Sequence, residues 1–264
     1  MVNRFQATAT KYQKSICAAI AIAVFLVVWQ LVVLFTKAGL VLAGPIETIS
    51  AFLQAIWSPI GTHTIEGHIL WSLSRVLVGF VLGSLAGIAL GILMGWFRPF
   101  SAFFRPIFEI LRPIPPIAWI PLSIVWFGLG ESSKYFLIFY SAFCAVTMNA
   151  YSGVRAVDPE LMGAARMLGA SNRQVFTTVV LPSCVPQIFA GLQIAIGTSW
   201  ATVVAAEMVR SSEGVGWVII KGQDSNSTVQ ILVGIVAIGI VGYILAVTMR
   251  AIEAKLCRWS VRGK

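Results

Sequence analysis

The chain has 264 residues, of which 58% are apolar and only 11% are charged. A soluble domain carries roughly 45–50% apolar and about 25% charged residues, so this composition excludes an ordinary soluble enzyme. The formal net charge is +9, from 19 Lys and Arg residues against 10 Asp and Glu residues. Some nucleic-acid-binding proteins are equally basic, but here the charges lie in short segments between long apolar runs. The pattern therefore indicates a membrane protein.

Six uncharged runs are each close to the roughly 20 residues that an α-helix needs to cross a bilayer. In chain order they are 15–36, 76–97, 113–130, 135–154, 181–206 and 228–249. The first run is too long for the apolar part of a signal peptide, so we expect a retained helix. The third run contains several prolines, which predict an irregular start and a kink. We therefore expect an all-α membrane protein with six transmembrane helices.

Basic residues fall mainly on one side of this predicted topology. With a cytoplasmic N-terminus, 14 of the 19 Lys and Arg residues fall in the inner segments 1–14, 98–112, 155–180 and 250–264. The other 5 fall in the outer segments 37–75, 131–134 and 207–227. Because cytoplasmic loops are enriched in Lys and Arg, both termini are predicted to be cytoplasmic. No predicted span has an ionisable residue in its middle, which argues against a self-powered secondary transporter.

Small residues form a periodic face on two of the spans. In the second span a glycine recurs at every fourth position, at Gly79, Gly83, Gly87, Gly91 and Gly95. The fifth span repeats the spacing with Gly191, Ala195 and Ser199. Such faces let two helices approach closely, so tight packing is expected, with a surface that slides during transport as the alternative.

Polar and aromatic side chains within the third to fifth spans are candidates for lining a translocation pathway. Each of them could instead bond to a helical carbonyl or anchor helix packing, and the sequence leaves both roles open. The candidates are Trp119, Asn149, Ser199, Trp200 and Thr202.

The segment between the fourth and fifth spans is patterned as two short helices. Asp158, followed by Pro and Glu, is typical of a helix start, and Gly169 suits the end of that helix. One apolar face of small residues is predicted from Leu161, Ala164, Ala165 and Leu168.

The second short helix is predicted to begin at a capping box formed by Ser171 and Gln174, and to break or kink at Leu181-Pro182. The whole loop could lie on the membrane as an interfacial helix or dock into a groove of a partner.

The run Gly163-Ala164-Ala165-x-x-x-Gly169, followed after nine residues by Val179-x-Leu181-Pro182, resembles the EAA signature of permease subunits in ABC importers. Gly163 and Val179 stand where the family form has Glu and Ile. Residues 112–122, 126–131, 168–171 and 205–207 are similar to the nitrate, sulfonate and taurine branch, and most of all to its taurine permeases.

This resemblance implies a type I ABC importer permease fold. The core would span 65–250 and include a cytoplasmic coupling loop, 155–182. Segment 1–64 would hold the N-terminal tail, the first helix and an outer loop, and 251–264 would be a basic cytoplasmic tail. The resemblance also implies ATPase-coupling residues, which are Gly163, Ala164, Ala165, Arg166, Leu168, Gly169, Ala170, Leu181 and Pro182.

The function implied by the resemblance is passage of a small organic anion, taurine or another alkanesulfonate, through the bacterial inner membrane. Expected partners are two cytoplasmic ATPase subunits, a periplasmic binding protein, a second copy of the chain and the lipid bilayer. The chain has no GxxxxGK[ST] phosphate loop, so ATP with magnesium is expected in the partner and no enzyme activity or cofactor here.

Several alternatives stay open at this stage. A nitrate, bicarbonate or pyrimidine-precursor permease would share the same family pattern. A secondary transporter or a membrane enzyme is more distant. The spacing of His63 and His68 misses the metalloprotease motifs, and the four cysteines are scattered, so no metal site is expected.

Overall fold

The structure is a computed structural model that describes residues 2–209 and 211–257. Helices account for the regular structure of these residues, which contain no β-strand. The elements are α1 (Val2–Phe35), η1 (Lys37–Leu40), α2 (Pro45–Trp57), α3 (Ile65–Trp96), α4 (Arg98–Leu111), η2 (Pro116–Trp119), α5 (Ile120–Phe127), α6 (Glu131–Arg155), α7 (Pro159–Met167), α8 (Asn172–Gln174), a π-helical turn (Val175–Val180), α9 (Leu181–Val209), α10 (Val215–Asp224) and α11 (Thr228–Leu256). Most of the predicted basic tail, 258–264, lies outside the described residues.

The chain divides into two compact units, and each is described by itself. The first unit comprises Met1–Ile65 and Val218–Val236. In this unit α1 is one long helix, so the predicted tail at 1–14 is helical from residue 2 and continuous with the first span. The apolar stretch Ile16–Phe35 has no buried residue in its most hydrophobic window, as expected of a helix that faces lipid.

The second unit, Glu66–Trp217 with Ala237–Lys264, contains the glycine face of α3. A Cβ atom added at Gly79 would meet the side chain of Ile138, and one added at Gly95 would meet Val154. Because the partner residues on α6 advance together with the glycines, α3 and α6 run parallel. The expected tight packing is confirmed, and the partner helix belongs to the same chain.

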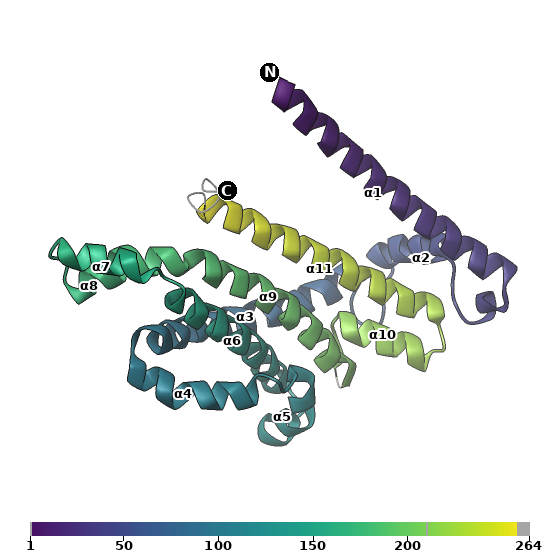
Figure 1. Ribbon diagram of the computed structural model, residues 1–264. Helices are drawn as coiled ribbons and strands as arrows, with labels where there is room; N and C mark the ends of the chain where they lie inside the picture. The colour runs from purple at the N-terminus through teal and green to yellow at the C-terminus, as the bar shows by residue number, and fades with distance from the viewer. Residues whose placement is uncertain (1, 210, 258–264) are drawn as a thin grey trace. The chain divides into compact units, whose positions relative to one another are not determined.

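Helix α9 packs on α6 in the opposite direction. Gly153 near the end of α6 lies against Cys184 near the start of α9, whereas Gly191 lies against the earlier residue Asn149. Figure 1 shows the two helices side by side along most of their length. The small-residue face predicted for the fifth span is therefore a packing face against α6.

The chain between α3 and α6 returns along α6 as a broken helix. Along α4, Phe108 stacks near Phe143 at a centroid distance of 5.4 Å, and the carbonyl of Leu111 accepts the Tyr140 hydroxyl at 2.9 Å. The axis then bends by 87° before α5, which packs beside Leu137 near the start of α6. Figure 1 shows this bend.

The parallel course of α3 and α6 requires this return. The chain leaves α3 at one end of the pair and must reach the other end before α6 can begin. The sequence placed this crossing at 113–130 and assigned 98–112 to an inner loop. That assignment is wrong, since α4 supplies the first part of the path and the prolines after it cause the break. Five of the described helices are long and apolar enough to cross a membrane, and the bent pair raises the number to six.

Candidate functional site

Both ends of α7 are formed as the sequence predicts. Asp158 is the N-cap, and its carboxylate accepts a backbone N–H of the first turn at 2.8 Å. At the other end the N–H of Gly169 donates to the carbonyl of Arg166, and the N–H of Ala170 donates to that of Ala165. These two bonds make a Schellman motif, which needs a left-handed residue and finds it in Gly169 at φ 85°.

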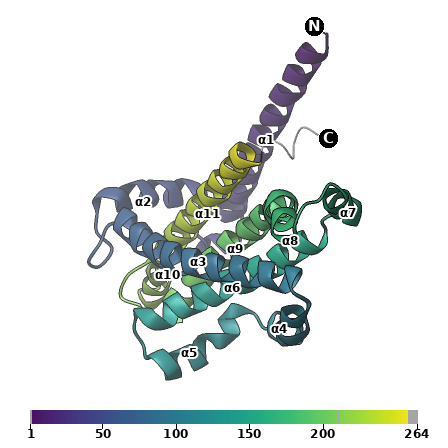
Figure 2. The same cartoon turned by 90° about the vertical axis from the view of Figure 1, so that its left-hand side faces the viewer.

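The two faces of α7 differ from the predicted ones. Met162 and Ala165 pack inward against a buried cluster that joins the end of α6 to the start of α9. Ala164, Met167 and Leu168 are exposed, and Leu168 is 90% exposed. Ala165 therefore lies at the edge of the predicted face and is half-buried, whereas Ala164 and Leu168 are exposed. Figures 1 and 2 show α7 at the C-terminal end of α6, away from α5.

The capping box of Ser171 and Gln174 is present, but the helix that it starts does not end where expected. A π-helical turn, Val175–Val180, connects it to α9 without an interruption. Of the break or kink predicted at Leu181-Pro182, the break is wrong, because Asn172–Val209 is one continuous helical segment. A proline inside a helix lacks the N–H that would donate to the preceding turn. Pro182 directly follows the π-helical turn, where the hydrogen-bond register shifts, and the helix continues past it.

Two further predicted docking residues lie on α7. Gly163 is half-buried, and a Cβ atom added there would meet no atom within 4 Å, so packing within this chain does not require glycine. Arg166 lines a cavity of about 620 Å³ together with Arg98 and Arg155. No ion pair joins these three arginines to a carboxylate among the described residues.

A second cavity, of about 220 Å³, lies between the break after α4 and the facing parts of α6 and α9. Its polar lining comes from Arg112, Tyr140, Asn149 and Thr198, among others. Of the predicted pathway residues, Asn149 is in this lining, and the Trp119 ring lies 5.3 Å from the ring of Tyr140. Of the five candidates, Asn149 thus lines this cavity, and Trp119 packs against Tyr140, one of its lining residues.

The other three candidates are buried in helix packing instead. The indole N–H of Trp200 donates to the carbonyl of Ile238 on α11 at 3.1 Å. The Thr202 hydroxyl bonds within its own helix, and Ser199 is fully buried. All three are buried by the packing of α9 within this chain, and their place on a pathway stays a prediction.

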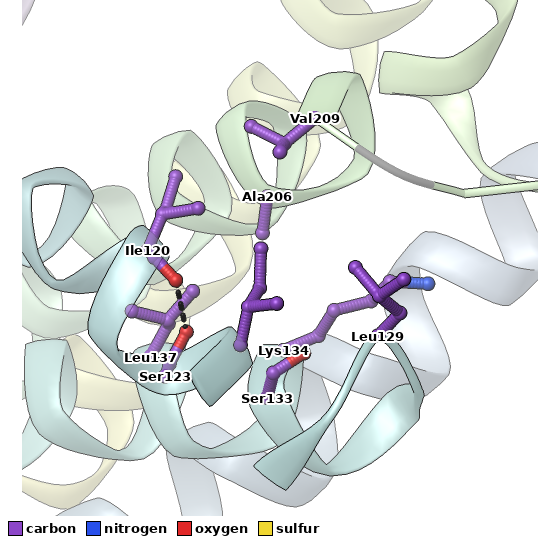
Figure 3. A pocket seen from close by; sticks show the side chains of 9 residues that line it. Ile120, Ser123, Leu129, Ser133, Lys134, Leu137, Ala206 and Val209 are labelled. Carbon is purple, nitrogen blue, oxygen red and sulfur yellow. Dashed lines mark hydrogen bonds between the residues drawn. The ribbon is translucent and has the colours of Figure 1, made fainter. Parts of the chain in front are cut away.

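A third cavity lies between α5, the start of α6 and the end of α9, and it is shown in Figure 3. Its volume of about 10 Å³ is about that of a single water probe, so it is too small for an organic molecule. The amine of Lys134 points away from it and binds Glu131 and Ser211 at 2.8 and 3.0 Å.

A buried polar cluster joins the starts of α3 and α6 to the end of α9. The guanidinium of Arg75 donates to Glu131 at 2.5 and 2.8 Å and to Glu207 at 2.8 Å. Glu207, only 1% exposed, also accepts from the Ser72 hydroxyl and from the N–H of Gly216. Every charge is thus paired or hydrogen-bonded, as burial demands.

The sequence does not reveal this cluster, because the uncharged run of the second span begins one residue after Arg75 and Glu207 stands out only in the family resemblance. The signal that could have found both is a charge adjoining a long apolar run on the predicted outer side. His68 belongs to the same region, where its Nδ1 accepts the N–H of Gly214 at 3.1 Å and its ring lies 5.1 Å from Trp217.

The chain is similar in sequence to known transport proteins. Residues 79–257 match the family described as binding-protein-dependent transport system inner membrane component. The taurine transport system permease protein TauC of Escherichia coli is 35% identical over 240 residues, which cover 90% of this chain and 87% of the relative. The nitrate import permease protein NrtB of Leptolyngbya laminosa is 37% identical over 238 residues, with 88% and 84% covered.

A solved structure of the MetNI methionine ABC transporter in an inward-facing conformation has the same fold. The TM-score is 0.61 at 19% identity, over 81% of this chain and 99% of that one. The expected fold, an all-α permease of the ABC importer type, is confirmed, whereas the side on which the termini lie stays a prediction. The chain therefore belongs to the binding-protein-dependent family of ABC transporter inner membrane components.

Proposed function

We propose that this chain is the permease subunit of an importer for a small organic anion, taurine or another alkanesulfonate. The observation that carries the proposal is its similarity, over nearly its whole length, to a taurine permease. The comparably similar nitrate permease supports nitrate import as a second candidate. In either case the bilayer-crossing helices provide the pathway and a partner provides the energy.

The proposed assembly contains two copies of this chain, two cytoplasmic ATPase subunits that bind ATP with magnesium, and a periplasmic binding protein. It would lie in the bacterial inner membrane with both chain termini in the cytoplasm. The predominance of basic residues on the predicted inner side supports this orientation. The partner supplies hydrolysis, because this sequence has no phosphate-binding loop.

Helix α7 is the proposed docking element for the ATPase. It is capped at both ends and held to the core on one side, while Ala164, Met167 and Leu168 are exposed on the other. A rigid helix with a small apolar face fits the groove of a partner. Its similarity to the EAA signature, despite Gly163 at the acidic position, gives independent support.

The substrate is tested by growth of a strain that lacks this gene. We expect loss of growth on taurine and alkanesulfonates as the only sulfur source, with normal growth on sulfate, and restoration by a plasmid copy. Normal growth on sulfonates with a defect on nitrate as the nitrogen source would replace sulfonate by nitrate and leave the permease function in place.

The docking role predicts separate effects for the two faces of α7. We expect Leu168→Asp to lower copurification with the ATPase and to reduce uptake by about tenfold or more, because a charge would enter an apolar contact. Gly169→Asp should act similarly by straining the left-handed position. Pull-down of the ATPase and uptake into proteoliposomes measure both effects.

Two variants serve as controls for this experiment. Ala165→Glu should lower the thermal stability of the permease itself, since Ala165 packs against the buried cluster. Leu129→Asp, at an exposed apolar residue beside α5, should leave ATPase copurification unchanged. Wild-type copurification and uptake with Leu168→Asp would exclude α7 as the docking element.

A further inference from the structure

Arg112 is the C-cap of α4 and lies, exposed, in the turn where the crossing is broken. It follows α4 directly, where the Leu111 carbonyl meets Tyr140 of α6, and it lines the cavity of about 220 Å³. With a rise of 1.5 Å per residue, Tyr140 is about 14 Å along the axis from the start of α6. An arginine at such a depth is costly and commonly marks a path for a substrate or an ion.

The guanidinium of Arg112 has no counterion among the residues that the structure describes. Among the described residues no carboxylate pairs with it and no hydrogen bond to it is formed, and the cavity lining contains no acidic residue. Its five N–H donors are therefore available to an anion, which guanidinium can bind through two parallel hydrogen bonds.

A buried hydroxyl adds a second unused polar group to the same cavity. Ser141 is 4% exposed, lines the cavity, and its Oγ has no hydrogen-bond partner. Such an unpaired hydroxyl costs free energy unless something binds to it. Asn149 uses one amide N–H on the carbonyl of Ala145 and keeps the other. Arg112 and Asn149 thus offer donors to the cavity, and Ser141 places an unpaired, buried hydroxyl in its wall.

The remaining lining is mostly apolar and comes from all the elements around the cavity. Ile114 and Pro116 contribute from the break before α5, Met148 from α6 and Ile194 from α9. Apolar side chains do not stabilise a bare inorganic anion. They would stabilise a bound ligand with a short alkyl chain, because that chain would be removed from water. The lining therefore favours an anion that carries an apolar part.

We propose that this cavity is a transit site for a small organic anion, with Arg112 binding the charged head, Ser141 donating to it, and the Ile114–Met148–Ile194 wall covering the alkyl chain. The proposal rests on the proposed function for its substrate class, the alkanesulfonates. Binding at this site is expected to be weak, because a conducting site must also release its substrate.

The site is tested by direct binding to the permease–ATPase complex without the binding protein. The probe is 3,3,3-trifluoropropane-1-sulfonate, observed by the ¹⁹F NMR line width. We expect the wild-type complex to broaden the ¹⁹F line of the probe. An excess of ethanesulfonate should reverse this broadening, and nitrate at the same concentration should not. The uncharged 3,3,3-trifluoropropanol should show no such broadening, which separates the site from detergent partitioning.

Variants identify the residue that holds the anion. Arg112→Gln should weaken probe binding by about tenfold or more, since a charge-assisted pair is worth about 1.5–3 kcal/mol. Arg112→Lys should restore part of it, and Ser141→Ala should weaken it by about two- to tenfold. Arg105→Gln, which removes an exposed ion pair with Glu109 on the same helix, is the matched control and should bind as the wild type does.

Probe binding that is equal in wild type, Arg112→Gln and Ser141→Ala would overturn the proposal, as would the absence of broadening in the wild type. If the gene-deletion strain grows normally on sulfonates while Arg112-dependent probe binding persists, the importer's substrate assignment fails and the anion site stands. Thermal unfolding of each purified variant identifies any that fail to fold. If Arg112→Gln is one of them, the proposal is judged by whether Ser141→Ala weakens probe binding.

Discussion

At the residue scale, the Arg75–Glu207 pair shows how this membrane protein accommodates buried charge. Arg75 and Glu207 are 2% and 1% exposed and lie 2.8 Å apart. The pair comes from α3 and α9, and Glu131 of α6 accepts two further bonds from the same guanidinium. Removal of one member would leave the other charge buried without its partner, which costs far more than the pair contributes.

This geometry predicts a large effect of Glu207→Gln or Arg75→Met on stability. The expected loss is about 3–5 kcal/mol in the free energy of unfolding, because breaking a buried pair leaves an uncompensated charge. The double variant Arg75→Met with Glu207→Met should recover part of the loss. Thermal and denaturant unfolding in detergent measures these differences.

The exposed pair Arg105–Glu109 provides the comparison for that measurement. Its side chains are 56% and 57% exposed at a distance of 2.8 Å, so Glu109→Gln is expected to change the free energy of unfolding far less than Glu207→Gln does. Equal losses for Glu207→Gln and Glu109→Gln would contradict the structural role of the buried cluster.

At the element scale, the α3–α6 contact shows what a fourfold-spaced glycine face does. At each of these glycines an added Cβ would lie too close to a backbone atom or a β-carbon of α6. At Gly87 it would be 3.0 Å from the carbonyl oxygen of Phe143 and 3.1 Å from the Cβ of Val146. Dispersion between closely approaching backbones stabilises helix pairs in lipid, where the hydrophobic effect does not drive them together.

Gly87→Leu is accordingly expected to destabilise the permease by about 1–3 kcal/mol or to prevent its assembly, because an added side chain would force α3 from α6. Gly239→Leu on α11 is the control, since a Cβ there meets no atom within 4 Å. Thermal stability in detergent and yield of folded protein distinguish the two. An unchanged Gly87→Leu protein would argue against close packing of these helices.

At the scale of the whole molecule, the broken crossing decides which loops share a side of the membrane. The parallel course of α3 and α6 places Ser101 at one end of these helices, and Ser132 lies at the other end, at the start of α6. A re-entrant loop would instead bring both to the same side. The two arrangements differ in sidedness, which is measurable.

We expect Ser101→Cys and Ser171→Cys to react with a membrane-impermeant maleimide from the cytoplasmic side, and Ser132→Cys from the opposite side. The background would carry alanine in place of Cys17, Cys144, Cys184 and Cys257. Oriented vesicles with opposite sidedness give the comparison. If Ser101→Cys and Ser132→Cys both react from the same side of the membrane, α4 and α5 do not cross it.

The sequence by itself determined the features that depend on local chemistry. Apolar length identified five of the crossings, and the caps at Asp158, Gly169 and Ser171 followed from residue type and spacing. Glycine spacing predicted a close contact for α3. Each of these signals lies within a short stretch of chain and can therefore be recognised without knowing which distant residues pack against it.

Only the tertiary structure decided where long-range partners meet. The outward and inward faces of α7 depend on a cluster built by α6 and α9, so Ala165 could not be assigned from its own helix. The pairing of Arg75 with Glu207 joins residues far apart in the chain, and apolar patterning carries no record of such pairs.

The third crossing shows the same limit most clearly. An uncharged run predicts a crossing only when the crossing segment contains no charged residue. Here Arg112 lies between α4 and α5, within the broken crossing, and lines a cavity. Its depth is set by the parallel packing of α3 and α6, which forces the intervening chain to return across the bundle. Arg112 and the prolines are visible in the sequence, but only helix packing places them beside this cavity.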